Sequence, residues 1–402
     1  MSHFIGDLEV KNFRAFKHLQ IKKLGQVNLI VGKNNVGKTC LLEALMLYAS
    51  RGSTKAITDI LTARDEFAIE DSQESKAFAV RHLFHGRPDL TSLNNKSLKI
   101  KSISDEKRNL FIELTVVDKS LADRLSNEYQ YRGGRISLDD TDLSKLISEL
   151  TNNGLSPEAL GLLSEAPRIH NTVITGSSIR SIIIMVISDD QSVGIIDYKL
   201  NEIAYGRPNQ EIPHIFVGTM GLDAFQTAQL WDTVYLTPQE DDVVEALRII
   251  EPAIKSVGLV ESNTQKGVRI PRVRLSGRDT PILLSSLGEG MNRIFGLTLA
   301  LVNVKDGFLF VDEIGNGIHY SAQPKLWNFL FQVAEQLNVQ LFATTHSWDV
   351  IEAFQESAQA HRQVEGVLIS LRNKFNSPGE VVGTIFTEQD LEIVTRDQIE
   401  IR

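Results

Sequence analysis

The chain has 402 residues and a formal net charge of −9 at pH 7, with 42% hydrophobic and 23% charged residues. This composition is typical of a globular protein, and the length allows two or three domains or one large domain with insertions. Proteins that depend on nonspecific affinity for nucleic acids are usually basic. A nucleic-acid role therefore requires a local basic patch or a partner.

The sequence contains a single cysteine, Cys40, which excludes a disulfide framework and a cysteine-based metal cluster. The first residues lack the basic start and apolar core of a signal peptide. No run approaches the about 18 uninterrupted apolar residues of a membrane span. We therefore expect a cytoplasmic protein without membrane contact, in which Cys40 is a small buried thiol.

The first half of the chain predicts an ordered start followed by a loosely patterned lobe. Apolar and alternating runs predict strands at residues 8–13, 19–21 and 27–31, then a helix at about 38–50. Residues 52–213 predict strands at 98–103, 110–117 and 182–187, with helices at 77–84, 143–150 and 157–164. We interpret this stretch as an inserted α+β lobe with no assignable chemistry.

Regular alternation of strand and helix returns after Pro213. Strands are predicted at residues 215–218, 308–311, 339–342, 366–371 and 381–386, and helices at 237–247, 288–302, 321–337 and after Ser347. Residues 268–275 and 281–284 look like a hairpin. Strands that alternate with helices in this way imply an α/β fold with a mixed or parallel sheet and helices packed on it.

A phosphate-binding loop of the form G-x4-G-K-T lies between the strand at 27–31 and the helix that begins near residue 38. Its backbone amides can converge on nucleotide phosphates at the helix N-terminus, where the dipole favours negative charge. The lysine would reach the β- and γ-phosphates and the threonine hydroxyl would hold Mg²⁺. A chance glycine-rich turn would rarely have both flanks, so we predict nucleotide contacts from Gly32, Lys33, Asn34, Asn35, Val36, Gly37, Lys38 and Thr39.

Two acids, Asp312 and Glu313, follow the apolar strand at 308–311. At the carboxyl end of a strand, Asp312 can meet Mg²⁺ opposite Thr39, directly or through water. Glu313 would face the space beyond the γ-phosphate, where a general base polarises the attacking water. By itself the pair could equally be an exposed acidic turn, and the upstream phosphate loop favours the functional interpretation.

A serine- and glycine-rich segment, residues 285–290, opens the helix at 288–302 and forms a second possible anion site at a helix N-terminus. One nucleotide cannot easily use both helix N-termini of the same subunit. Two subunits packed head to tail could instead place Ser286, Gly288 and Glu289 of one over the phosphates bound by the other. The segment in isolation would be only a Gly/Ser turn.

His346 follows the strand predicted at 339–342, within the run Ala343–Ser347. A histidine there can bond the γ-phosphate or the attacking water and so detect whether the nucleotide is intact. A single histidine at a strand end is more often structural, so its position relative to the other motifs carries the prediction. Asn316 and His319 are weaker candidates that would lie along a subunit interface.

In chain order, the phosphate loop, the serine–glycine segment, the apolar strand with its two acids and the Thr–His–Ser run resemble the ABC-type ATPase heads of the SMC, RecF and OLD (overcoming lysogenization defect) families. The similarity covers roughly residues 1–50 and 280–350. It implies that residues from Asn34 to Cys40 contact ATP and that Thr39 and Asp312 hold Mg²⁺. It also implies that Glu313 is the catalytic base and that Lys38 is a further catalytic residue. It further implies His346 as the switch residue and Ser286 as the contact from the neighbouring subunit.

The resemblance implies an ABC-type P-loop head divided into residues 1–51 and 214–402, with residues 52–213 inserted between them. No long heptad run matches the coiled-coil arms of a true SMC protein, and the signature Ser285–Glu289 is closer to OLD-type ATPases of bacterial antiphage systems. Too few residues follow His346 for the TOPRIM nuclease domain of an OLD protein. Gln73 is a weak candidate for the glutamine-loop residue.

We therefore expect a Mg²⁺-dependent ATPase, slow and regulatory, that forms head-to-tail homo-oligomers and controls a separate nuclease or toxin in antiviral defence. The alternative is a DNA-repair ATPase of the RecF or SMC kind that clamps DNA when ATP drives dimerisation. A third class is a scaffold that binds ATP and barely hydrolyses it. A P-loop kinase or GTPase is least favoured, because no guanine-reading N-K-x-D stretch accompanies the loop.

Overall fold

The computed structural model describes residues 5–66, 79–88, 96–104, 109–117, 148, 181–188, 192–197, 212–374, 380–387, 390, 391, 393 and 395. The helices predicted at 143–150 and 157–164 lie outside this part of the chain, apart from residue 148, and so does Gln73. The division into residues 1–51, 52–213 and 214–402 stays a prediction.

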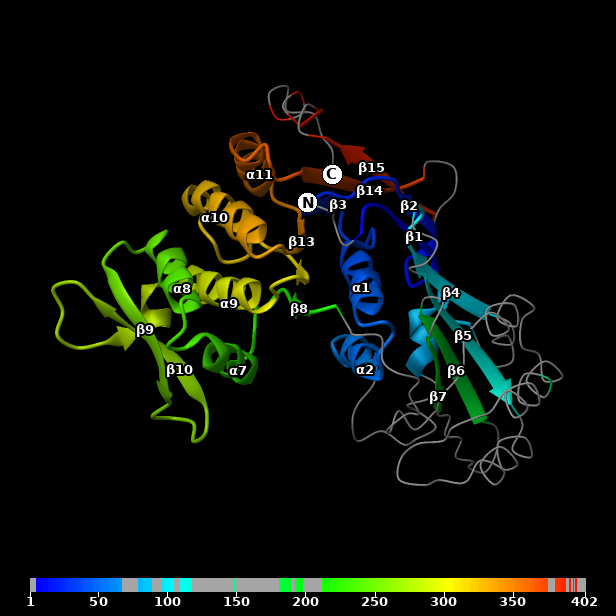
Figure 1. Ribbon diagram of the computed structural model, residues 1–402, viewed down its shortest axis with the longest axis horizontal. Coiled ribbons are helices and arrows are strands. Elements are labelled where there is room, and N and C mark those ends of the chain that lie inside the picture. The colour runs from blue at the N-terminus through cyan, green and yellow to red at the C-terminus, as the bar shows by residue number, and fades with distance from the viewer. Residues whose placement is uncertain are drawn as a thin grey trace.

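A six-stranded sheet forms the centre of the molecule, in the order β15-β14-β3-β13-β12-β8 (Figure 1). Five neighbouring strands run parallel, and β15 pairs antiparallel at one edge. The predicted parallel sheet with helices is confirmed. Its strands are β3 (Val27–Gly32), β8 (His214–Val217), β12 (Phe308–Val311), β13 (Gln340–Thr345), β14 (Gly366–Asn373) and β15 (Val381–Phe386).

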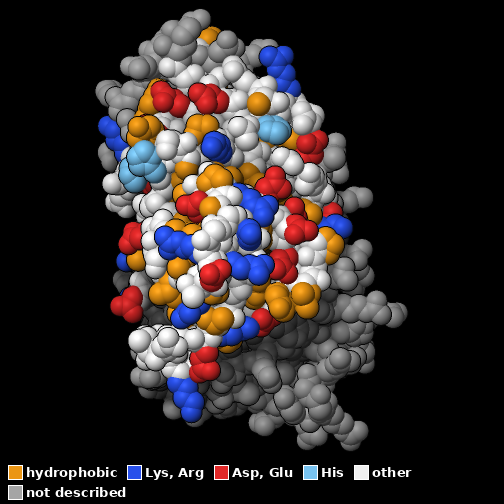
Figure 2. All heavy atoms as spheres, turned by 90° about the vertical axis from the view of Figure 1, so that its left-hand side faces the viewer, with side chains coloured by type: hydrophobic (Ala, Val, Ile, Leu, Met, Phe, Trp, Pro, Cys, Tyr) orange, Lys and Arg blue, Asp and Glu red, His pale blue; other side chains and the backbone are white. Residues whose placement is uncertain are grey.

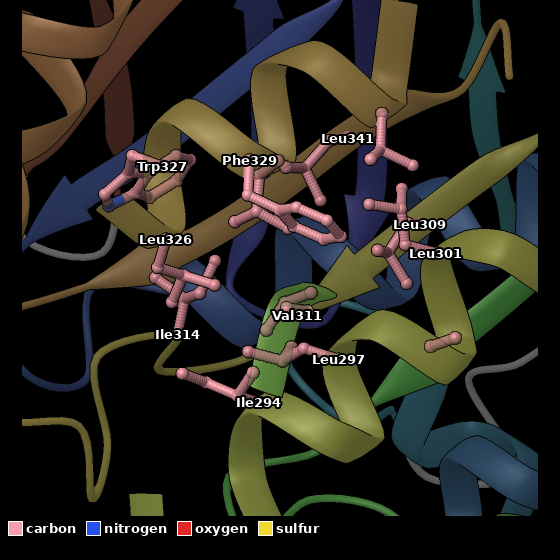
Figure 3. Close-up of a cluster of buried hydrophobic side chains, with 14 of the residues drawn as sticks. Ile294, Leu297, Leu301, Leu309, Val311, Ile314, Leu326, Trp327, Phe329 and Leu341 are labelled. Atoms are coloured by element: carbon pink, nitrogen blue, oxygen red, sulfur yellow. The ribbon is translucent and has the colours of Figure 1, made fainter. Parts of the chain in front are cut away.

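Both faces of this sheet are buried, as parallel strands require. Successive side chains of a strand point to opposite faces, so β12 sends Phe308 and Phe310 to one core and Leu309 and Val311 to the other. The first core is shared with α1 (Lys38–Ala49), and the second with α9 (Glu289–Asn303) and α10 (Gln323–Gln336). Figure 3 shows the second core, where aliphatic side chains of α9 meet those of β12 and α10.

Four further α-helices have bounds in the described part of the chain. α11 (Trp348–Ala360) packs against α10, and α8 (Gln239–Arg248) matches the helix predicted at 237–247. Sequence reasoning missed α2 (Thr54–Thr62) and α7 (Ala224–Val234). The signal for α7 was present, because Asp223 and Gln226 form a reciprocal capping box at its N-terminus.

A second sheet is antiparallel, in the order β2-β1-β4-β5-β6-β7. It contains the strands predicted at 98–103, 110–117 and 182–187, and these extend the sheet begun by the two N-terminal strands. The strands are β1 (Leu8–Phe13), β2 (Phe16–Ile21), β4 (Lys96–Lys101), β5 (Asn109–Val117), β6 (Ser181–Ser188) and β7 (Ser192–Asp197).

Of the helix predicted at 77–84, the structure describes residues 79–84. Ala79 is α-helical, a 3₁₀ turn, η1 (Val80–Leu83), continues from it, and Phe84 is extended, so the prediction is wrong at Phe84. Phe84 is buried and pairs with Phe13 through an isolated β-bridge. This long-range contact ends the helical segment before the predicted boundary.

A small three-stranded sheet lies beside α7 and α8, in the order β11-β10-β9. The predicted hairpin is confirmed as β10 (Arg269–Leu275) and β11 (Ile282–Leu283). Sequence reasoning missed β9 (Ile254–Glu261), because its lysine, serine and glycine interrupt the apolar alternation. No helix in the described ranges has the length and apolar character needed to cross a bilayer.

Glu9 ties together β1, β2 and β4 on the second sheet. Its carboxylate lies 2.8 Å from His18 Nε2, 2.8 Å from Gln20 Nε2 and 3.2 Å from Lys11 Nζ. Lys101 Nζ from β4 is 3.5 Å away. Burial by itself would raise the pKa of Glu9, but the hydrogen bonds from His18, Gln20 and Lys11 outweigh it and lower the pKa to about 2.

We predict that Glu9→Gln destabilises the protein at pH 7 by about 2 kcal/mol, because charge-assisted hydrogen bonds are lost. The lowered pKa stabilises the fold above the ordinary glutamate value of 4.5, and this contribution disappears as pH falls towards 2. Urea unfolding of both proteins should therefore give a stability gap that closes over this range. Exposed Glu356→Gln is the matched control, and a gap independent of pH would contradict the assignment.

Candidate functional site

Three neighbouring parallel strands, β3, β13 and β12, end at the same edge of the central sheet. The phosphate loop follows β3, His346 follows β13, and the two acids follow β12. Ligands of open α/β sheets bind at the carboxyl ends of such strands. Strand order thus brings the phosphate loop to the acids and the histidine, although Thr39 and Asp312 are 273 residues apart in the sequence.

The phosphate loop runs from the end of β3 at Gly32 to the start of α1 at Lys38. Gly37 has φ 106°, and a Cβ there would lie 3.0 Å from Ala15 and Phe16. A Cβ on Gly32 would lie 2.6 Å from the carbonyl oxygen of Leu371, so both positions require glycine. The first turn of α1 has neither a side-chain cap nor an acidic residue, which leaves its amides suited to an anion.

Lys38 is buried between the loop and the acidic strand end. Its Nζ donates a hydrogen bond of 3.0 Å to the Gly32 carbonyl and lies 3.7 Å from Glu313 Oε1. The ammonium group therefore lies within the phosphate loop, where it is predicted to contact the β- and γ-phosphates.

Asp312 joins the ends of all three strands. Thr39 Oγ1 donates to Asp312 Oδ2 at 2.9 Å, and Thr344 Oγ1 donates to Oδ1 at 2.6 Å. Asp312 is 6% exposed, so these two hydroxyl groups donate the hydrogen bonds that water would otherwise donate to its carboxylate. The geometry leaves two hard oxygen donors, Thr39 Oγ1 and Asp312 Oδ2, side by side next to the phosphate loop.

Glu313 has a left-handed backbone conformation, with φ 50°. A non-glycine residue pays about 1–2 kcal/mol for this conformation, so neighbouring contacts must hold it. Its N–H donates to Thr344 Oγ1 at 2.8 Å, and its Oε2 lies 2.8 Å from His346 Nδ1. The turn thereby directs the carboxylate towards both Lys38 and His346.

Arg293 of α9 is a site residue that sequence reasoning missed. Its Nη2 donates to the carbonyl oxygens of Asp312 at 2.8 Å and Glu313 at 3.2 Å, and Nη1 donates to Gly218 at 2.7 Å. Burial lowers the pKa of the guanidinium, against the raising effect of Asp312 and Glu313. The sequence offered one signal, since Arg293 stands beside a long apolar run of the helix. A charge buried in such a place needs hydrogen-bonding partners.

The serine–glycine segment lies apart from these residues. Ser286 belongs to η4 (Leu284–Leu287), Gly288 caps α9 with φ 108°, and Glu289 opens its first turn. All three are exposed, and within the described ranges no hydrogen bond or ion pair links them to the phosphate loop or the acids. One chain does not bring Ser286, Gly288 and Glu289 into hydrogen-bonding contact with its own phosphate loop.

The turn after Glu313 connects the two regions. A Cβ on Gly290 of α9 would lie 2.7 Å from the carbonyl oxygen of Gly317, so the first turn of α9 packs closely on this turn. Asn316 Nδ2 donates to the Thr219 carbonyl at 3.5 Å, and His319 caps the short η5 (Tyr320–Ala322). Asn316 and His319 are exposed, and their interface role stays a prediction.

The structure therefore gathers Lys38, Thr39, Asp312, Glu313 and His346 at one edge of the sheet and leaves the signature segment on the surface. Cys40 is buried at the start of α1, as expected, and burial raises the pKa of its thiol. The catalytic, nucleotide and metal roles of these residues stay predictions.

Two family models match different parts of the chain. Residues 4–158 match the family described as "AAA ATPase domain", and residues 224–352 match "AAA domain, putative AbiEii toxin, Type IV TA system". The first match contains the phosphate loop. The second contains the signature segment, Arg293, the two acids and His346.

Among curated proteins, an ATP/GTP phosphatase of Helicobacter pylori is 21% identical over 365 residues, covering 88% of each chain. RecF, a DNA replication and repair protein, from Bacillus mycoides is 24% identical over 166 residues, which is 41% of this chain and 34% of RecF. The head of an SMC protein bound to the winged-helix domain of ScpA superimposes with a TM-score of 0.46 at 11% identity, covering 96% and 98% of the two chains.

The phosphate loop between β3 and α1, the acids after β12 and the strand order agree with the two ATPase matches and with the similarity to RecF. Together these findings support an SMC/RecF-type ABC P-loop ATPase.

Proposed function

We propose that this ATPase hydrolyses ATP with Mg²⁺ in sites shared between two copies of the chain, and that the cycle controls a separate effector. One observation carries the proposal most directly. Hydrogen bonds run from Thr39 through Asp312 and Thr344 to the backbone of Glu313, whose side chain bonds His346. This continuous set connects the two predicted Mg²⁺ ligands with the predicted base and the predicted switch histidine.

The residues present fit Mg²⁺ bound together with ATP. Thr39 and Asp312 would hold the ion through oxygen atoms, which Mg²⁺ prefers. In the described ranges no group of three or more His, Cys, Asp or Glu residues could hold a metal by itself. Phosphate oxygens and water would therefore complete the coordination, and the bound ion would offset the charge of the β- and γ-phosphates.

Lys38 and Glu313 would change partners when ATP binds. Phosphate oxygens would attract Lys38 Nζ away from Glu313 Oε1, which is 3.7 Å away in this structure. The carboxylate would then be available to accept a proton from the attacking water, with His346 holding its other oxygen. Turnover would be slow if this exchange limits it, as expected for a regulatory ATPase.

The exposed signature segment supports a site completed by a second copy. The first turn of α9 has no side-chain cap, so its amides could meet the γ-phosphate bound by a neighbouring subunit.

The effector is a nuclease or toxin encoded separately, and the system acts in antiviral defence. The similarity of residues 224–352 to a family described by a toxin–antitoxin system supports an effector of this kind. The signature Ser285–Glu289 supports an OLD-like ATPase. The alternative, a repair ATPase that clamps DNA on dimerisation, is supported by the similarity to RecF.

We predict that Lys38→Ala abolishes ATP binding, because the phosphates lose their cation. Glu313→Gln should retain binding and slow turnover by about 10²–10⁴-fold, since only the proton acceptor is lost. Phosphate release and binding of a fluorescent ATP analogue measure the two effects, with exposed Lys325→Ala as the control. Unchanged turnover in either variant would refute the assigned roles, and negligible wild-type turnover would indicate a scaffold.

A mixing experiment tests the shared site. Lys38→Ala and Ser286→Arg should each be inactive alone, because each homodimer has two defective sites. Mixed one to one, the heterodimer has one intact site, so about a quarter of wild-type turnover should return. Ser286 is exposed, so the arginine should not disturb folding. No recovery in a mixture shown to form heterodimers would mean that the site does not span two chains.

We predict that Arg293→Lys lowers kcat by about 10²-fold with little change in KM for ATP. Lysine keeps the charge but cannot hold three carbonyl oxygens in a fixed fork, so Glu313 loses its position. Steady-state kinetics give the split between kcat and KM, and thermal unfolding checks the fold. Equal losses of ATP affinity and turnover would indicate a general structural role instead.

A further inference from the structure

The small sheet β11-β10-β9 ends in an open edge. β9 is an edge strand of eight residues, and within the described ranges it pairs with β10 alone. Figure 1 shows this sheet at the end of the molecule away from the antiparallel sheet. An edge strand presents a row of free N–H and C=O groups to which a further strand can bind. Its centre, Val257–Val260, contains neither a charge nor a proline to oppose such pairing.

The register with β10 shows which backbone groups of β9 face the open edge. The Ser262 N–H donates to the Val268 carbonyl at 2.7 Å, so these residues form a hydrogen-bonded pair beside the hairpin loop. Bonded and non-bonded pairs alternate along an antiparallel ladder. Pro271 agrees with this phase, because it lies opposite Leu259 in a non-bonded pair and its missing N–H costs no bond to β9. The residues of β9 that direct N–H and C=O towards the edge are therefore Lys255, Val257, Leu259 and Glu261.

No contact in the described part of the chain requires a glycine at the centre of β9. Gly258 is not in a left-handed conformation, and a Cβ built on it meets no atom within 4 Å. A glycine inside a strand weakens the sheet, and it often marks a place where another backbone approaches closely. Gly258 forms a bonded pair with Arg272 of β10, so it is a non-bonded position towards the open edge. In such pairs the Cα atoms approach to about 4.5 Å.

We propose that β9 pairs antiparallel with β9 of a second copy of this chain, about a two-fold axis at Gly258, without nucleotide. This inference goes beyond the shared ATP site and does not depend on it. In this register Lys255 of each chain lies opposite the partner's Glu261, and Val257 lies opposite the partner's Leu259. These are the residues whose backbone groups face the edge, so their pairing forms about eight inter-strand hydrogen bonds. An opposite-charge pair closes each end of the contact.

The charges of β9 favour a second copy over an unrelated strand. A two-fold contact must be self-complementary, and Lys255 and Glu261 are equally far from Gly258 in opposite directions along the strand. Lys255 is exposed and has no hydrogen bond or ion pair among the described residues. Glu261 uses Oε1 for the Gly267 amide, at 3.0 Å, and keeps Oε2 for a partner. Figure 2 faces this side and shows both charge signs among apolar side chains, so a copy can meet opposite charges here.

The buried face of the small sheet would continue across the axis. Val257 pairs with Val273, and both are buried in the core that includes α8. Leu259 packs against the same core but is only half-buried. In the proposed pair, Val257 and the partner's Leu259 lie side by side on this face, so the apolar layer extends from one chain into the other.

The proposed contact leaves the residues of the ATP site free. β10 and β11 lie between β9 and η4, which contains Ser286, and the phosphate loop lies at the edge of the central sheet. One chain can therefore use both contacts at once. If the shared ATP site of the proposed function also forms, ATP would join β9-paired dimers into larger assemblies.

Sedimentation of the full chain without nucleotide tests whether this dimer exists. We expect the mass of two chains, and Lys38→Ala should keep it, because the contact does not use the phosphate loop. A wild type that is monomeric at every concentration would overturn the proposal. Loss of the dimer in Lys38→Ala would overturn it too and indicate that the chains meet through the ATP site.

A disulfide tests the register. Gly258→Cys places two thiols at the axis in a non-bonded pair, where a disulfide can form, and Cys40 is buried and cannot compete. Val260→Cys is the matched control on the same face, because the partner's Val260 would lie about 13 Å further along the strand. Mild oxidation should cross-link the first variant and not the second. Equal cross-linking of both would overturn the proposal.

A charge exchange tests the partner residues. Lys255→Glu and Glu261→Lys should each weaken the dimer by about tenfold or more, because like charges then face each other at both ends. Mixed one to one, the two variants should form heterodimers of wild-type affinity, since both ends regain opposite charges. Lys325→Glu, at an exposed site elsewhere, should dimerise like the wild type. Equal weakening in Lys325→Glu, or no recovery in the mixture, would overturn the proposal.

Discussion

The carboxylate of Asp312 is the junction on which the site depends. It receives hydroxyl hydrogen bonds from Thr39 after β3 and from Thr344 in β13, while Asp312 itself directly follows β12. A carboxylate this deeply buried is stable only when such partners are present. The same two bonds that satisfy it therefore fix the relative position of three strand ends, and with them the space in which a triphosphate would lie.

Strain at Glu313 follows from this junction. Asp312 is held in place, so the chain turns through a left-handed conformation to direct the next carboxylate towards Lys38 and His346. Arg293 compensates by bonding the carbonyl oxygens on both sides of the turn. Because Arg293 belongs to the helix that begins at the signature segment, any force on that helix acts on the position of the proposed base. Contact of a partner with the signature segment would therefore affect the position of Glu313 through this one helix.

Local sequence determined the elements whose pattern is self-contained: the buried strands, the phosphate loop between strand and helix, and the acids after β12. It did not determine Arg293, the hydroxyl partners of Asp312 or the extended conformation of Phe84, because each depends on residues far away in the chain. Thr39 and Asp312 are 273 residues apart, and only the order of parallel strands brings them within 2.9 Å. Periodicity encodes which side of an element is buried, whereas strand order and long-range hydrogen bonds are decided when the elements pack.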